Sequence, residues 1–218
     1  MRSSIPRVPH LPGSRLGQSD LVVDDGDLPA FLGRPVVVTE KQDGVALTIA
    51  FDGAGVDVAM KRDWSSALNG RILRAARRWV RVHERALLPF VVDGDVLYAE
   101  WLLHRLVTRY TALPSAVVFH TWRTTSGALV PRDVANAAFA AAGLAFIEPF
   151  FRGVIGERPL KLLLPARARF APKARPEGFI VERVDDDGAA SWAKWVAPHY
   201  RQPRGTELTG ALNVVVAS

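Results

Sequence analysis

The chain has 218 residues, 49% of them hydrophobic and 23% charged, which suffices for one large hydrophobic core or two small ones. The absence of cysteine excludes disulfides, thiolate zinc sites and a cysteine nucleophile, and it favours a reducing compartment. No apolar run approaches the roughly 20 residues of a membrane span, and the start MRSSIPRVPH lacks the apolar core of a signal peptide, so we expect a cytoplasmic protein. A net charge of +6 favours an anionic partner such as a nucleic acid or a nucleotide.

Proline and glycine recur in IPRVPHLPGSRLGQSD, which predicts an extended N-terminal segment over residues 1–35. The first half of the chain then alternates β-branched runs with glycine-containing turns, followed by one long arginine-rich helix. The predicted strands are 36–39, 45–51, 56–60, 96–102 and 116–122, and the predicted helix is 65–88.

The second half begins with an alanine-rich helix in PRDVANAAFAAAGL, which has a proline near its start. Further strands are predicted at 145–151, 178–184 and 193–197, and the stretch LPARARFAPKARPEG is predicted to be a flexible connection. Because the elements do not alternate regularly as βαβ units, we expect an α+β fold with antiparallel sheets flanked by helices. No repeat divides the chain, so residues 1–218 are predicted to form a single domain.

The predicted long helix carries arginines at three- and four-residue spacing, which places them on one face. A solvated helix surface would explain them. Four like charges on one face repel one another, however, unless phosphates or carboxylates meet them, so the stripe also fits a surface that contacts a nucleic-acid backbone. The residues of this stripe are Arg71, Arg74, Arg78 and Arg81.

The stretch EKQDG places Lys41 between two strand-like runs. A lysine there can act as a nucleophile if burial or neighbouring positive charge favours loss of its proton. Asp43 would then hold a ribose hydroxyl or orient the amine, and Gly44 would let the backbone approach a nucleotide. A simple Asp-Gly hairpin turn would explain the same residues.

Four later stretches place polar or aromatic side chains in apolar strands. Glu100 lies in LYAEWLL, Phe119 in SAVVFHTWR, Glu177 in EGFIVERV and Lys194 in SWAKWVAPHY. A buried unpaired carboxylate costs several kcal/mol, so Glu100 should have a partner, and Phe119 offers a stacking face for a base. Each stretch alone also fits an ordinary core strand.

Together these stretches resemble the motifs of the covalent nucleotidyltransferase superfamily of ATP-dependent DNA ligases, RNA ligases and GTP-using mRNA capping enzymes. EKQDG is similar to motif I, YAEWL to motif III, VVFHTW to motif IIIa, EGFIVER to motif IV and AKWV to motif V. The motifs lie within residues 40–196, and the likeness extends over residues 9–199. VPHLPGSRLG, the 99–122 stretch and AKWVAPHY are most similar to RNA ligases of the nick-sealing type.

The resemblance implies an ATP-dependent RNA ligase. Lys41 would attack the α-phosphate of ATP and form a lysine–AMP phosphoramidate. The AMP would pass to an RNA 5′-phosphate, and a 3′-hydroxyl at an RNA end or nick would displace it. Lys194 would contact the α-phosphate and help to keep Lys41 partly deprotonated through like-charge repulsion.

The resemblance also assigns the remaining groups around the nucleotide. Glu177 and Glu100 would hold Mg²⁺ or Mn²⁺ as oxygen ligands, and Phe119 would stack on the adenine. Glu40 either reads the base or is a satisfied surface residue. Arg62, in AMKRDW, would lie near the phosphates or the substrate end.

Two features depart from the family pattern. Motif V often has two lysines, but only Lys194 is present here, so one phosphate contact is either missing or supplied by an arginine such as Arg175 or Arg183. The sequence ends soon after motif V, which leaves no room for an OB-fold or a C-terminal helical domain and counts against a capping enzyme or a complete DNA ligase.

We expect the protein to be a monomer that is not membrane-bound. Four alternatives to an RNA ligase function remain. They are a DNA ligase-like enzyme, a GTP-using relative, AMP transfer to a non-RNA acceptor, and a non-catalytic nucleic-acid-binding module.

Overall fold

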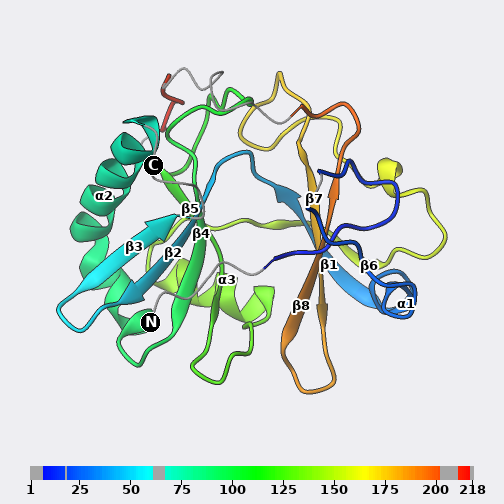
Figure 1. The fold of residues 1–218 in the computed structure, drawn as a ribbon, viewed down its shortest axis with the longest axis horizontal. Helices are drawn as coiled ribbons and strands as arrows, with labels where there is room; N and C mark the ends of the chain where they lie inside the picture. Colours follow the sequence, from blue (N-terminus) through cyan, green and yellow to red (C-terminus); the bar gives the residue numbers. More distant parts are fainter. Residues whose placement is uncertain (1–6, 18, 61–66, 202–210, 217–218) are drawn as a thin grey trace.

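The computed structural model describes residues 7–17, 19–60, 67–201 and 211–216, which form two four-stranded antiparallel sheets with three α-helices (Figure 1). The first sheet has the order β6 (Pro149–Val154), β1 (Pro35–Lys41), β7 (Gly178–Val184), β8 (Ala190–Val196). The second sheet has the order β3 (Val56–Met60), β2 (Val45–Phe51), β4 (Val96–Trp101), β5 (Val117–Arg123). The helices are α1 (Leu28–Leu32), α2 (Ala67–Val91) and α3 (Arg132–Ala141), with a 3₁₀ turn η1 at Leu160–Leu162. The predicted α+β class with antiparallel sheets is confirmed.

The chain passes from the first sheet to the second directly after Lys41. β1 ends at Lys41 and pairs with β6 and β7, whereas β2 begins at Val45 and pairs with β3 and β4. Since β1 and β2 do not pair, the Asp-Gly hairpin alternative is excluded. The KQDG stretch is instead the connection between the two sheets.

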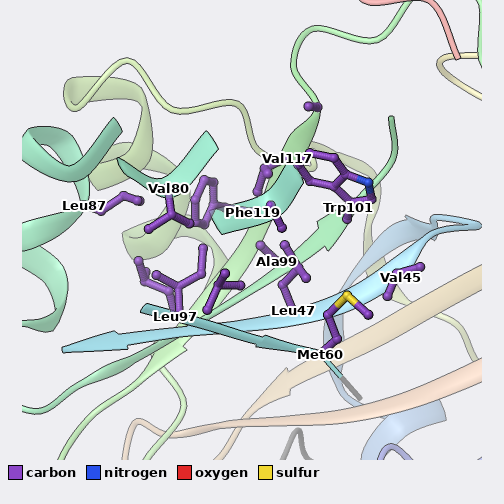
Figure 2. Packing of buried hydrophobic residues seen from close by; sticks show 14 of the residues in the cluster. Val45, Leu47, Met60, Val80, Leu87, Leu97, Ala99, Trp101, Val117 and Phe119 are labelled. Atoms are coloured by element: carbon purple, nitrogen blue, oxygen red, sulfur yellow. The ribbon is translucent and has the colours of Figure 1, made fainter. Parts of the chain in front are cut away.

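The long helix α2 packs on the second sheet and covers one of its faces (Figure 1). Its apolar side chains Ile72, Ala76 and Val80 are buried in one cluster with Leu47 and Leu97 from the strands (Figure 2). The apolar positions recur at the helical period, which explains why this segment forms an amphipathic helix on a sheet. The predicted arginine stripe lies on the exposed side of α2.

The first sheet has its own core, in which the rings of Phe179 and Trp195 stack with centroids 5.3 Å apart. The N-terminal segment runs beside the edge strand β8, where Leu11 N donates to Lys194 O at 2.8 Å and Lys194 N donates to Pro9 O at 2.8 Å. The prediction of an extended segment over 1–35 is wrong at α1, because Asp27 precedes a short helix with proline in its first turn.

Two further predictions need correction. The predicted strand 145–151 is divided, since Phe119 N donates to Ala145 O beside the second sheet, whereas β6 begins only at Pro149 and pairs with the first sheet. The stretch predicted as a flexible connection packs against the protein: Ala168 and Phe170 are buried in a cluster with Tyr110. Its alternating alanines and Phe170 supply enough apolar surface to order it.

In the part of the chain that the structure describes, no helix is both long and apolar enough to cross a membrane.

Candidate active site

A cavity of about 250 Å³ lies between the two sheets, beside the point where the chain crosses from one to the other. The first sheet contributes Lys41, Ile180, Trp192 and Lys194 to its wall. The second sheet contributes Ala46, Leu47, Tyr98, Ala99, Glu100 and His120, and the cavity is completed by Val8, Gln42 and Gly44. We call this cavity the central pocket.

Strand pairing brings Lys41 and Glu177 together. Lys41, the last residue of β1, lies opposite Gly178, the first residue of β7. Glu177 is the residue directly before Gly178 in the chain. The Lys41 Nζ is 2.6 Å from Glu177 Oε1. The Glu177 side chain is only 4% exposed and that of Lys41 is 24% exposed, so the ion pair is largely shielded while the amine still reaches the pocket.

The carboxylates around Lys41 control its protonation. Burial lowers the pKa of Lys41, but the negative charges of Glu177, Glu100 and Asp43 outweigh burial and raise that pKa above its ordinary value. Burial raises the pKa of Glu177 to about 7, although the ammonium of Lys41 opposes this. The free pocket therefore holds Lys41 as an ammonium ion. The prediction that Lys194 keeps Lys41 partly deprotonated is wrong for this state, because the nearby carboxylates dominate.

Two carboxylates suit the pocket to a divalent cation. Glu100 lines the pocket, and Glu177 is paired with Lys41 beside it. Both negative charges raise the pKa of Lys41, and the charge of Glu100 also raises the pKa of Glu177. Such oxygens are the ligands that Mg²⁺ and Mn²⁺ prefer. No cluster of three or more acidic or histidine side chains with metal-site geometry occurs among the described residues. A cation here would thus take its remaining ligands from phosphate oxygens and water.

Asp43 holds the KQDG connection in place rather than facing the nucleotide. Its buried carboxylate accepts hydrogen bonds from the Tyr200 hydroxyl at 2.6 Å, from Val107 N at 2.9 Å and from Thr108 N. The Asp43 N–H donates to the Tyr110 hydroxyl at 2.7 Å. Because its carboxylate oxygens already accept these hydrogen bonds, the predicted contact of Asp43 to a ribose hydroxyl does not fit the structure. The negative charge of Asp43 still raises the pKa of Lys41.

Gly44 is required by the approach of two strands. A Cβ atom at this position would lie 2.6 Å from Glu100 Cγ and 2.7 Å from Trp101 O, which is closer than real Cβ contacts allow. The missing side chain lets the start of β2 pack against β4 and so brings Glu100 beside the KQDG connection. Gly44 also lines the pocket, so the predicted backbone approach to a nucleotide stays a prediction.

Phe119 does not face the central pocket, and the prediction that it stacks on adenine is wrong. Its side chain is 0% exposed and packs in the core beneath α2 with Trp79 and Phe139, at ring-centroid distances of 6.1 and 5.1 Å. Figure 2 shows it beside Val80 and Val117. The pocket is lined instead by the next residue, His120, because neighbouring strand residues point to opposite faces.

His120, Tyr98 and Trp192 also line the pocket and were not predicted as site residues. Tyr98 Oη and His120 Nδ1 are buried and have no hydrogen-bond partner among the described residues. Since an unpaired buried polar atom costs on the order of 1–3 kcal/mol, two of them in one pocket fit a ligand that pairs with them. The signal in the sequence was strand periodicity: Tyr98 lies two residues before Glu100 and Trp192 two residues before Lys194, which places each pair on one strand face.

Lys194 faces the pocket from β8, and its Nζ is 3.9 Å from Asp20 Oδ1. Asp20 also lies 3.1 Å from His10 Nε2. Burial and the positive charge of Lys194 lower the pKa of His10, so the neutral imidazole is favoured there. The N-terminal segment thereby fixes the position of Lys194.

The proposed substitutes for a second motif V lysine lie elsewhere. Arg183 is 2.9 Å from Asp185 and stacks over the Phe31 ring at 4.8 Å, and Arg175 is exposed; neither lines the central pocket. Arg62 lies outside the described residues, so its predicted contact stays a prediction.

Glu40 points away from the pocket, and neither predicted role fits it. The side chain is buried, and its Oε2 accepts a hydrogen bond from Arg169 N at 2.7 Å. Glu40 thus links β1 to the 164–178 stretch through a hydrogen bond. This contact could not be predicted from the sequence because 129 residues separate the two partners. Burial raises the pKa of Glu40 to about 6.

This pKa predicts a pH effect on stability. Between the ordinary value of 4.5 and about 6, the folded protein keeps a proton at Glu40 that the unfolded chain releases, so stability falls as pH rises through this range. We expect wild type to lose up to about 2 kcal/mol of unfolding free energy, relative to Glu40→Gln, between pH 4 and pH 7.5. Urea unfolding of both proteins measures this difference. A constant difference across pH would contradict the assignment.

The predicted stripe of Arg71, Arg74, Arg78 and Arg81 is exposed on α2. Because α2 packs on the second sheet and the central pocket lies between the sheets, the stripe is on the other side of that sheet from Lys41 (Figure 1). The structure does not bring the stripe together with the pocket residues.

A family model described as RNA ligase matches residues 34–196, which is more than half of the chain. The chain belongs to the RNA ligase family. No curated protein matches the sequence.

Solved structures support the same fold. An RNA ligase from Naegleria gruberi with pyrophosphate superimposes with a TM-score of 0.57 at 14% identity, over 89% of this chain and 60% of that one. Point mutants of the Naegleria gruberi ligase also match: one with AMP and manganese has a TM-score of 0.57 at 12% identity, and one with ATP and manganese has 0.53 at 10%. Each of these two matches covers 89% of this chain and 60% of the other. This RNA ligase family member thus spans about 60% of the length of the ligase it matches.

Proposed function

We propose that the protein is an ATP-dependent RNA ligase that forms a covalent lysine–AMP intermediate on Lys41. The observation that carries the proposal is the amine of Lys41, which reaches a pocket between two sheets and is paired there with Glu177 at 2.6 Å. Glu100 and Lys194 face the same pocket. A nucleophile, two oxygen ligands and a second cation are the groups that phosphoryl transfer needs.

In the first step, the Lys41 ammonium loses a proton to water, and the neutral amine attacks the α-phosphorus of ATP. A nitrogen–phosphorus bond forms, the bond to the bridging oxygen breaks, and pyrophosphate leaves. A divalent cation held by Glu177 and Glu100 would neutralise the carboxylates that raise the Lys41 pKa and would withdraw charge from the phosphate. Lys194 supplies a further positive charge on the β8 side of the pocket. Its fixed position lowers the cost of orienting that charge.

The nucleotide would lie in the central pocket with its base near the aromatic residues. The His120 and Trp192 ring centroids are 6.2 Å apart and the ring planes are inclined at 64°, so the two rings offer one stacking face and one edge. Tyr98 Oη and His120 Nδ1 would supply polar contacts to the base or the ribose. The structural relatives carry ATP, AMP or pyrophosphate, and two of the three also carry manganese, which supports ATP and Mg²⁺ or Mn²⁺ as the cofactors.

In the later steps, AMP passes from Lys41 to an RNA 5′-phosphate, and a 3′-hydroxyl displaces it to form a phosphodiester. Membership of the RNA ligase family supports RNA ends or a nicked duplex as the substrate, and we propose a role in RNA repair. The net charge of +6 suits a polyanionic substrate. We further propose a cytoplasmic monomer.

Sealing of a nicked substrate tests this proposal. With ATP and Mg²⁺, we expect the protein to convert a nicked RNA duplex with a 5′-phosphate and a 3′-hydroxyl into a continuous strand, and to leave a nick without the 5′-phosphate open. Parallel reactions with GTP and with an all-DNA nick measure the nucleotide and strand preferences. Accumulation of lysine–AMP without sealing of any RNA substrate would point to another acceptor and contradict the ligase assignment.

A further inference from the structure

A second and larger hollow lies on the other side of the second sheet from the central pocket. It is a groove of about 1140 Å³ between α2 and the segment that follows β4. Trp101 and Leu103 line it from the β4 side, and Trp79 lines it from α2. Glu100 and Trp101 are neighbours in β4, and one lines the central pocket while the other lines the groove. The two hollows thus share β4 as a wall.

Aromatic and apolar side chains form much of the groove surface. The rings of Trp79 and His83 stack with centroids 3.8 Å apart and planes 13° from parallel. The Trp101 side chain, by contrast, is only 1% exposed, and its Nε1 donates a hydrogen bond to His104 Nδ1 at 2.9 Å. Val82 is 75% exposed on the same side of α2. Such a surface costs free energy in water and gains from contact with flat apolar groups.

Arginines from α2 also line the groove. Arg74, Arg78 and Arg81 are exposed, and no ion pair joins any of them to a carboxylate within the described ranges. Arg77 also lines the groove but lies 3.2 Å from Asp57 Oδ1. Like charges on neighbouring helix turns repel one another, so this arrangement favours a ligand that brings several negative charges.

We propose that this groove binds single-stranded RNA, with its phosphates at Arg74, Arg78 and Arg81 and its bases against Trp79 and His83. A positive groove with aromatic side chains is the general solution for single-strand binding, because every unpaired base has a face that can stack. A duplex fits less well, since its base faces are covered by neighbouring base pairs and it would leave the apolar wall exposed to water. The proposal rests on the proposed function and adds to it a site for unpaired RNA on the other side of the second sheet from Lys41.

The test compares the binding of two fluorescein-labelled RNAs by anisotropy, a short oligouridine and a blunt hairpin. Wild type should bind the oligouridine more tightly than a hairpin of equal charge. The double variant Arg78→Gln/Arg81→Gln should weaken oligouridine binding about tenfold and reduce the slope of log K against log salt by roughly 1.4, since each phosphate contact contributes about 0.7 for a single strand. The matched control is Arg85→Gln, an exposed arginine of the same helix that does not line the groove, and it should change binding less than twofold.

A second variant tests the stacking contact apart from the charges. Trp79→Leu should weaken oligouridine binding at least about fivefold with an unchanged salt slope, whereas Trp79→Phe should restore most of the affinity because it keeps an aromatic face. Thermal unfolding of each variant identifies any loss caused by misfolding, and the Phe variant keeps the test valid if the Leu variant unfolds.

The outcomes separate this proposal from the proposed function. The groove variants should form lysine–AMP at the wild-type rate, because they lie on the other side of the second sheet from Lys41. Equal affinity for the hairpin, or equal losses in Arg85→Gln and Arg78→Gln/Arg81→Gln, would overturn the groove proposal while lysine–AMP formation still stands. Unchanged RNA binding in every variant, with the groove instead occupied by a protein partner, would overturn it as well. RNA binding at the groove without any lysine–AMP would leave the groove proposal intact and contradict the proposed function.

Discussion

Lys41→Ala abolishes the covalent attachment of AMP, which we expect to fall to the background level. The substitution removes the amine that must form the bond to the α-phosphorus. Among the described residues, the other lysine of the pocket is Lys194, which comes from β8 on the far side of β7 and cannot replace Lys41 without moving. Incubation with ATP labelled at the α-phosphate, followed by denaturing electrophoresis, measures the attachment. The matched control Lys161→Ala removes an exposed lysine outside the pocket and should label as wild type does.

The same variant should keep its fold and its ability to bind ATP without reacting. Removing Lys41 leaves Glu177 buried without its partner, and because burial already raises the pKa of Glu177 to about 7, that carboxyl can take up a proton instead of holding an unpaired charge. We therefore expect a melting temperature within a few degrees of wild type at pH 6 and a clear loss of stability at pH 8.5. Normal labelling of Lys41→Ala would show that the nucleophile is another residue.

Glu177→Gln should lower the rate of lysine–AMP formation by roughly 100-fold or more. Glutamine has the size of glutamate but carries no charge, so it weakens the hold on the divalent cation and loses the ion pair that orients the Lys41 amine at 2.6 Å. Part of the loss should be recovered at high Mn²⁺ or Mg²⁺ concentration if the carboxylate is a metal ligand. The measurement is the single-turnover rate of AMP attachment over a metal titration.

Glu157→Gln is the control for this experiment, because Glu157 is exposed and does not line the central pocket. It should give the wild-type rate at every metal concentration. A Glu177→Gln rate equal to wild type at low metal would remove Glu177 from the reaction, and a lower rate that no metal concentration improves would assign it to orienting Lys41 alone.

A shared site for Lys41 and Glu177 could be predicted because each belongs to a short motif beside a strand. The family resemblance placed both residues around one nucleotide, whereas the register of β1 and β7 that brings the two side chains together was not predicted. The role of the KQDG stretch as a connection between sheets could not be predicted. It depends on the partners of β1 and β2, which come from residues 149–184 and 56–101.

Phe119 and His120 show a limit of prediction from strand periodicity. Strand alternation predicts that neighbouring side chains face opposite sides of the sheet, but it does not predict which side faces the pocket. In addition, the pairing of β4 with β5 shifts register between Tyr98 and Ala99. Glu40 shows a second limit, since its partner Arg169 is distant in the sequence and offers only a backbone N–H. Neither the register shift nor a backbone donor leaves a mark in the residue pattern.

The measurement that tests the central claim most directly is the intact mass of the purified protein before and after incubation with ATP and Mg²⁺. We predict a gain of one AMP, located on the peptide that contains Lys41 and removed again by pyrophosphate. A protein isolated with AMP already bound would instead lose that mass on addition of pyrophosphate, which supports the same reaction. No gain with ATP together with no loss with pyrophosphate would contradict the lysine–AMP mechanism.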